Sequence, residues 1–194
     1  MGGGNWIQLR MKDETESEIE QMATQALSFC MQHEATFIMN DHVHLAAKIG
    51  ADGVHLGKQD MAPDKAREIL GPQAIIGGTA NTFEDIKRLV QQGVDYIGLG
   101  PFRYTETKKN LSPVLGNAGY QSIFDACKKE GISVPVVAIG GLTPEDFPEL
   151  FQTGVYGVAL SSYITKHEQP GAATLDLLQS IGKCSSANWG KTNY

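Results

Sequence analysis

The chain has 194 residues, 41% of them hydrophobic and 20% charged, which is enough for one well-cored domain and short for two. Its formal net charge of −6 argues against a general attraction to nucleic acid, so an anionic ligand must be held at a specific site. No apolar run approaches the length of about 18 residues that would indicate a membrane helix. We therefore expect one domain over residues 1–182 and, from its composition, a disordered tail over residues 183–194.

Three cysteines, Cys30, Cys127 and Cys184, form an odd set without CxxC spacing. The first two fall in helix-like segments, where a small buried thiol is the ordinary explanation. The N-terminus also lacks the basic stretch and apolar core of a signal peptide. The sequence therefore predicts a reduced protein of the cytoplasm.

Short apolar runs without polar alternation recur along the chain, which is typical of strands covered on both faces. In chain order the predicted strands are residues 6–9, 36–39, 53–56, 74–76, 96–99, 134–139 and 157–160. Amphipathic helical segments lie between them, at residues 17–33, 43–49, 63–70, 83–92, 120–130 and 144–152. Thr82 and Thr143 supply helix-capping signals, and glycines such as Gly50 and Gly93 end the preceding helices.

This alternation of strand and helix with short connections indicates parallel βα units. Seven units suit a closed barrel better than an open doubly wound sheet, which usually has five or six strands. The predicted fold class is therefore α/β, a (β/α)8 TIM barrel that lacks its first βα unit.

Polar residues follow almost every predicted strand. In a (β/α)8 barrel the active site lies at the carboxyl ends of the strands, so these residues are the candidates for a convergent site. They are Gln8, Arg10, Lys12, Asn40, Asp41, His55, Asp60, Thr79, Thr105, Thr107, Lys108, Gly140, Gly141, Ser161 and Ser162.

Two of these candidates, Asp41 and Asp60, leave adjacent predicted strands. A pair of carboxylates together with phosphate oxygens suits Mg²⁺, a hard ion that prefers oxygen ligands. Each aspartate alone is equally well explained as a helix cap or a turn residue. Their matching positions favour the metal.

The last two strand ends and one long loop are candidates for phosphate binding. Gly140 and Gly141 allow an anion to approach the backbone, and Ser161 and Ser162 occupy the place where such barrels commonly bind phosphate. The irregular stretch 100–110 offers hydroxyls and cations to a diphosphate. The alternatives are simple turn glycines and a solvated basic loop.

Five motifs lie at or near the ends of the predicted strands. They are Gln8-Leu9-Arg10-Met11-Lys12, Asn40-Asp41, Gly53-Val54-His55-Leu56-Gly57 through Asp60, Tyr96-Ile97-Gly98-Leu99-Gly100-Pro101 with Thr105-Glu106-Thr107-Lys108, and Ala138-Ile139-Gly140-Gly141. Together, in this order and over roughly residues 5–165, they resemble the thiamine phosphate synthase family. The resemblance implies a (β/α)8 transferase that joins hydroxymethylpyrimidine diphosphate to thiazole phosphate, forming thiamine monophosphate and diphosphate.

The resemblance also implies a role for each candidate residue. Asp41 and Asp60 would hold Mg²⁺, and His55 would lie near the pyrimidine. The diphosphate would meet Gln8, Arg10, Lys12 and Asn40, with Lys108 on the departing group. Thr105, Thr107, Gly141, Ser161 and Ser162 would receive the thiazole phosphate. Thr79 stands where the family often has serine, so a hydroxyl is kept.

Two alternatives stay open at the sequence level. A sister family shares the barrel but is a thiazole tautomerase, which needs neither diphosphate nor its metal; Asp41, Asp60 and the Thr-x-Thr-Lys loop favour the synthase. The other is a truncated, catalytically weak barrel that only binds phosphorylated ligands. It is motivated by the missing first βα unit, since the strand that carries Gln8 in this chain is the second strand of the resembling family. From that position we expect Met1 to be an internal or alternative start. The sequence leaves the oligomeric state open, although such barrels often associate.

Overall fold

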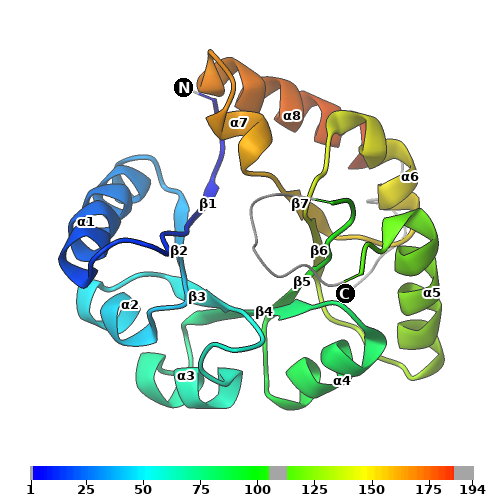
Figure 1. Cartoon of the computed structure of the whole chain (residues 1–194), viewed down its shortest axis with the longest axis horizontal. Coiled ribbons are helices and arrows are strands. Elements are labelled where there is room, and N and C mark those ends of the chain that lie inside the picture. Colours follow the sequence, from blue (N-terminus) through cyan, green and yellow to red (C-terminus); the bar gives the residue numbers. More distant parts are fainter. Residues whose placement is uncertain (1, 105–112, 186–194) are drawn as a thin grey trace. The chain divides into compact units, whose positions relative to one another are not determined.

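The computed structural model describes residues 2–104 and 113–185 (Figure 1). Strands and helices alternate along the chain. The strands are β1 (Trp6–Leu9), β2 (Thr36–Asn40), β3 (Gly53–Leu56), β4 (Ile75–Ala80), β5 (Tyr96–Leu99), β6 (Val136–Ile139) and β7 (Gly157–Ala159). The helices are α1 (Glu16–Gln32), α2 (Val43–Ile49), α3 (Pro63–Leu70), α4 (Phe83–Gln91), α5 (Gly116–Lys129), α6 (Phe147–Gln152), α7 (Ser162–Thr165) and α8 (Pro170–Ser185), with a 3-10 turn at Pro144–Asp146. The predicted α/β class with seven strands is confirmed.

The chain divides into two compact units. The first, which we call the β1–β4 unit, comprises Gly4–Thr79 and Arg88–Tyr96. The second, the β5–β7 unit, has its described residues at 2–3, 80–87, 97–104 and 113–185. Each is built of parallel βα repeats and is described by itself.

In the β1–β4 unit the strands pair in parallel in chain order. Gln8 lies opposite Ile38, Asn40 opposite His55, and His55 opposite Gly77. Because side chains alternate along a strand, residues two apart share a face. Gln8 and Asn40 therefore lie on the face that also carries His55, while their neighbours in sequence point toward the helices.

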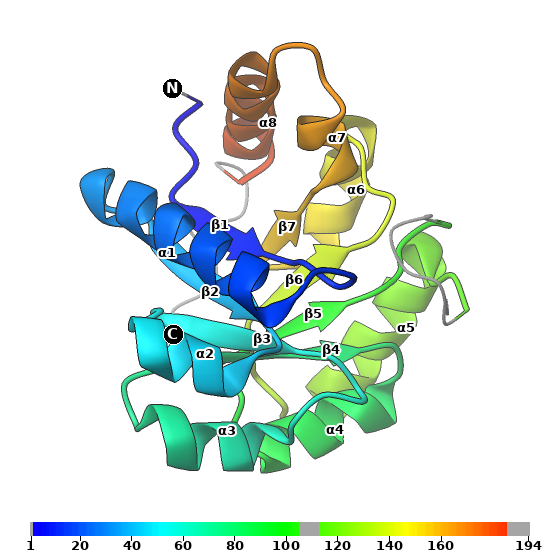
Figure 2. The same ribbon diagram turned by 60° about the vertical axis from the view of Figure 1, so that its left-hand side comes forward.

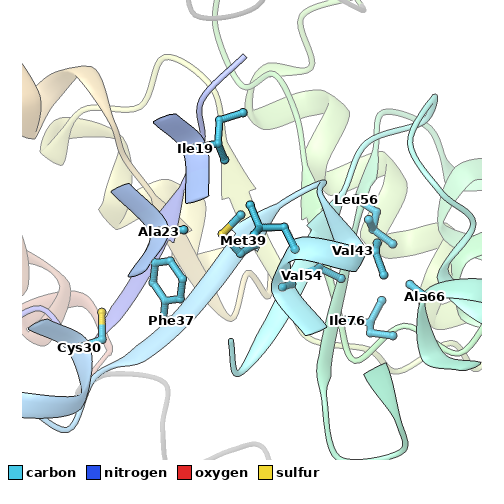
Figure 3. Packing of buried hydrophobic residues seen from close by; sticks show 12 residues of the cluster. Ile19, Ala23, Cys30, Phe37, Met39, Val43, Val54, Leu56, Ala66 and Ile76 are labelled. Atoms are coloured by element: carbon cyan, nitrogen blue, oxygen red, sulfur yellow. The ribbon is translucent and has the colours of Figure 1, made fainter. Parts of the chain in front are cut away.

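The opposite face of these strands holds the hydrophobic core of the unit. Figure 3 shows Phe37 and Met39 of β2 packed against Ile19, Ala23 and Cys30 of α1. Val54, Leu56 and Ile76 continue the same cluster beneath Val43 of α2 and Ala66 of α3, and all of these side chains are buried. A capping box between Thr15 and Glu18 fixes the start of α1.

In the β5–β7 unit, β5, β6 and β7 are also parallel, with Leu99 opposite Ala138 and Ile139 opposite Ala159. Helix α8 packs beside α6 and α7, as Figure 2 shows. Phe147, Phe151 and Leu177 form the buried centre of this contact.

Some element boundaries differ from the predicted ones. Strand β4 runs through Gly77, Gly78 and Thr79 to Ala80, so the glycines that ended the predicted strand at residue 76 belong to it. Helix α5 begins at Gly116 rather than residue 120. Helices α7 and α8 were not predicted, and α8 includes the first residues of the expected tail. Among the described residues no helix has the length and apolar content to cross a membrane.

Candidate active site

The β1–β4 unit brings the first group of predicted site residues to the carboxyl ends of its strands. The Gln8 Nε2 donates to the Asn40 Oδ1 across 3.2 Å, so the amides of β1 and β2 orient each other. Arg10 and Lys12 follow β1 directly; Arg10 is half-buried and Lys12 is exposed. This end of the unit therefore presents two amides and two cations.

Asp41 lies immediately after β2 in a backbone conformation that is uncommon for a residue with a side chain. Its φ is 61°, and that of His42 is 44°, both in the left-handed region. The Asp41 N–H donates to the His55 carbonyl oxygen across 2.9 Å, which ties the turn to β3. Strain of this kind is often found at functional sites, and here it fixes where the carboxylate leaves the sheet.

Asp60 is held by a reciprocal turn after β3. The Gly57 N–H donates to the Asp60 Oδ2 across 2.6 Å, and the Asp60 N–H donates to the Gly57 carbonyl oxygen across 3.2 Å. A Cβ at position 57 would lie 2.9 Å from that same Oδ2. The glycine therefore leaves the room that this carboxylate occupies.

The chemistry of Asp41 and Asp60 fits a hard divalent cation. Both are half-buried carboxylates, and neither forms an ion pair within residues 2–104 and 113–185. No cluster of three or more metal-ligating side chains exists in that part of the chain. A Mg²⁺ ion that uses one or two carboxylates and completes its shell with water and phosphate oxygens needs no such cluster.

His55 is buried between two hydroxyl groups of the same unit. Its Nδ1 lies 3.0 Å from the Tyr96 Oη, and its Nε2 lies 2.9 Å from the Thr79 Oγ1. Tyr96 packs edge-on against Trp6, with ring centroids 5.6 Å apart. The structure brings the predicted His55 and Thr79 together, and it adds Tyr96, which the sequence alone indicated only as an apolar strand residue.

A second group of site residues lies in the β5–β7 unit. Gly140 and Gly141 follow β6 with φ of 88° and 71°, conformations that favour glycine. A Cβ on Gly141 would come within 2.8 Å of the Arg103 Cβ and 2.9 Å of the Tyr104 carbonyl oxygen. These glycines therefore let the segment after β5 lie close against the end of β6.

Arg103 connects the segment after β5 to the segment after β6 by hydrogen bonds and an ion pair. Its guanidinium donates to both Asp146 carboxylate oxygens, at 2.8 and 2.5 Å, and to the Gly141 carbonyl oxygen at 3.2 Å. Burial alone would raise the pKa of Asp146, but hydrogen bonds from Arg103 and Thr143 outweigh it and hold this pKa below its ordinary value. Sequence analysis missed both members of this ion pair.

The remaining predicted residues are placed only in part. Ser161 and Ser162 are exposed at the start of α7, directly after the β7 strand. Thr105, Thr107 and Lys108 lie outside the described residues, so their predicted roles stay predictions.

Parallel βα units with polar residues gathered at the carboxyl ends of the strands define a barrel-type α/β protein of the kind that binds phosphorylated ligands there. The sequence model of the thiamine monophosphate synthase family matches residues 1–164. The chain belongs to this family.

Individual relatives agree with this assignment. The chain is 54% identical to a thiamine-phosphate synthase of Bacteroides thetaiotaomicron, over 91% of this chain and 85% of the relative. A thiamine-phosphate synthase of Flavobacterium johnsoniae is 52% identical over 86% of this chain and 79% of the relative. The solved structure of thiamine phosphate pyrophosphorylase from Pyrococcus furiosus matches with a TM-score of 0.82 and 31% identity, covering 94% of this chain and 85% of that one.

Proposed function

We propose that this protein is a thiamine-phosphate synthase, a transferase that joins hydroxymethylpyrimidine diphosphate to thiazole phosphate and releases diphosphate. The observation that carries the proposal is the group of amides, cations and carboxylates at the ends of β1–β3, in a chain 54% identical to a relative of that name. The substrates are small molecules, and every proposed contact is with a phosphate group or the pyrimidine.

The diphosphate of the first substrate is bound by the side chains that follow β1 and β2. Arg10 and Lys12 neutralise its charge, and Gln8 and Asn40 donate amide hydrogens to its oxygens. The bond between these two amides supports this role, because each orients the other before the ligand arrives.

Asp41 and Asp60 are proposed to hold Mg²⁺. Their fit rests on oxygen donors that have no cationic partner among the described residues. The bound ion would add positive charge beside the leaving diphosphate. The second oxygen of Asp60 is occupied by the Gly57 N–H, which keeps the carboxylate in one orientation.

The reaction is a substitution at the methylene carbon of the pyrimidine. The carbon–oxygen bond to the diphosphate breaks, and the electron pair leaves with the diphosphate. The aminopyrimidine ring delocalises the positive charge on the methylene, and the lone pair of the thiazole nitrogen forms the new carbon–nitrogen bond. The protein therefore has to neutralise the leaving group, with Lys108 as one of its cations, and to position the two reactants.

The thiazole phosphate is received by residues of the β5–β7 unit. Gly141 would donate its backbone N–H to the phosphate, and Ser161 and Ser162 would supply hydroxyls after β7. Thr105 and Thr107 complete this group in the proposal. The ion pair between Arg103 and Asp146 supports it by fixing the backbone beside Gly141.

The test is a diphosphate-release assay on the purified chain with both substrates. We expect release that requires both substrates and Mg²⁺, and that stops with excess chelator. A rate unchanged by chelator would contradict the metal assignment. Isomerisation of the thiazole without any pyrimidine substrate would support the tautomerase instead.

The cytoplasm is the proposed location. All three cysteines are free thiols, and two of them are buried. Such cysteines suit a reducing compartment.

A further inference from the structure

A buried row of side chains in the β1–β4 unit connects Tyr96 to Thr79 through His55. The distances are 3.0 Å from the Tyr96 Oη to the His55 Nδ1 and 2.9 Å from the His55 Nε2 to the Thr79 Oγ1. All three residues are less than a tenth exposed. A Cβ on Gly77 would lie 2.6 Å or less from three atoms of the Tyr96 phenol, so the glycine provides the space for this ring.

The direction of the first hydrogen bond follows from the surroundings of Tyr96. Burial raises the pKa of Tyr96, so its phenol keeps its hydrogen at neutral pH. Among the described residues the His55 Nδ1 is the only hydrogen-bond partner of this phenol. Tyr96 begins β5, and its phenol lies beside Gly77, two residues before Thr79 on β4, so it is further from the carboxyl ends of the strands where a ligand is expected. A ligand can supply an acceptor to the Thr79 hydroxyl but not to this phenol. A buried hydroxyl hydrogen without an acceptor is strongly disfavoured, so the Tyr96 O–H donates to Nδ1.

The direction of the second bond then follows from the chemistry of imidazole. A neutral imidazole that accepts at Nδ1 carries its hydrogen on Nε2, and it donates that hydrogen to the Thr79 Oγ1. The hydrogen of the Thr79 hydroxyl has no acceptor in the described part of the chain. The Thr79 hydroxyl can therefore donate this hydrogen to a bound ligand.

We infer that Tyr96 is a positioning residue that sets this relay, so that Thr79 acts as a hydrogen-bond donor to an acceptor nitrogen of the bound pyrimidine. The inference rests on the proposed function for the identity of the ligand. A site that presents a donor rejects a ring with a hydrogen at that position, because two donors would then face each other.

The first experiment measures the tautomer of His55 in the free protein. Nitrogen-15 NMR of histidine-labelled protein, with the His55 signals assigned by their loss in His55→Gln, is run at a pH where the ring is neutral. We expect an unprotonated Nδ1 and a protonated Nε2 in the wild type. The opposite tautomer in the wild type overturns the inference.

The second experiment compares Tyr96→Phe with Tyr120→Phe. Tyr120 is a matched control because it is also a buried tyrosine, but its phenol donates to the Leu99 carbonyl oxygen in the other unit. We expect Tyr96→Phe to lose the single His55 tautomer and to raise the KM for the pyrimidine substrate about tenfold, with the KM for thiazole phosphate unchanged. Equal effects on both KM values, or an unchanged tautomer, overturn the inference.

The third experiment uses a pair of Thr79 variants and covers the case in which Tyr96→Phe does not fold. Thr79→Ser keeps the hydroxyl and should retain the wild-type KM for the pyrimidine substrate, whereas Thr79→Val should raise it. Equal KM values in the two variants overturn the donor role. If no protein releases diphosphate, the proposed function fails, while the tautomer of the free wild type still decides the relay.

Discussion

The ion pair between Arg103 and Asp146 gives a prediction whose size can be worked out from burial. Arg103→Ala removes two charge-assisted hydrogen bonds from a carboxylate whose side chain is only 7% exposed. Breaking a fully buried pair costs about 3–5 kcal/mol. Two features reduce this value: the Arg103 side chain is 52% exposed, and Thr143 still donates to Asp146 through its N–H and its hydroxyl. We expect a loss of about 2 kcal/mol in the free energy of unfolding.

Urea unfolding measures this loss, and Lys48→Ala is the matched control. The Lys48–Glu20 pair has the same nitrogen–oxygen distance of 2.5 Å, but its carboxylate side chain is 37% exposed. We expect the midpoint to fall by about 1 M urea for Arg103→Ala, at a slope of about 2 kcal/mol per M, and by less than half of that for Lys48→Ala. Equal shifts would refute the argument from burial.

The pH dependence provides a second test of the same pair. The pKa of Asp146 is lowered in the folded protein, so its contribution to stability is present above the unfolded value of about 4 and is lost as the pH falls through the folded value. Because Arg103→Ala removes a main cause of this lowering, the difference in stability between wild type and variant should narrow below about pH 4. A constant difference down to the acid transition would contradict this reasoning.

Three further predictions concern other parts of the chain. Lys108→Ala should slow diphosphate release far more than Lys109→Ala in a steady-state assay, and equal effects would reject Lys108 as the cation on the leaving group. Asp60→Asn should raise the Mg²⁺ concentration for half-maximal activity at least about tenfold, whereas Asp64→Asn, on the exposed first turn of α3, should leave it unchanged. Gly53→Ala should prevent or strongly impair folding, measured by circular dichroism and urea unfolding, because its Cβ would lie 1.9 Å from the Ile75 carbonyl oxygen.

The strands could be predicted from sequence because their apolar runs are covered on both faces. β1, β3 and β5 begin and end at the predicted residues. Helix α8 was missed because its packing decides its structure: Leu177 and Ala173 are buried, and Leu177 packs against Phe147, a residue 30 positions earlier in the chain. Local sequence carries little of that information.

The residues of the candidate site also fall into a group that the sequence could predict and a group that it missed. Gln8, Asn40, Asp41, His55 and Asp60 could be predicted because the carboxyl ends of parallel strands collect polar residues, a property that can be read one strand at a time. The missed residues act through partners far along the chain. Tyr96 meets His55 across 41 positions, and Arg103 meets Asp146 across 43.

Glycines nevertheless mark several close contacts of the candidate site in the sequence, including those of the missed residues Tyr96 and Arg103. Gly57 leaves room for Asp60, Gly77 for Tyr96 and Gly141 for Arg103, since a Cβ at each would come within 3.0 Å of the residue it faces. Only Gly141 has a φ that itself favours glycine, so at the other two positions the need is for space rather than for backbone freedom. A glycine within or just after a buried strand, where no unusual φ explains it, thus indicates that a group from elsewhere must come close. The side chains beside Gly57, Gly77 and Gly141 belong to, or position, the candidate site, whereas Gly78 makes room for the core residue Leu89.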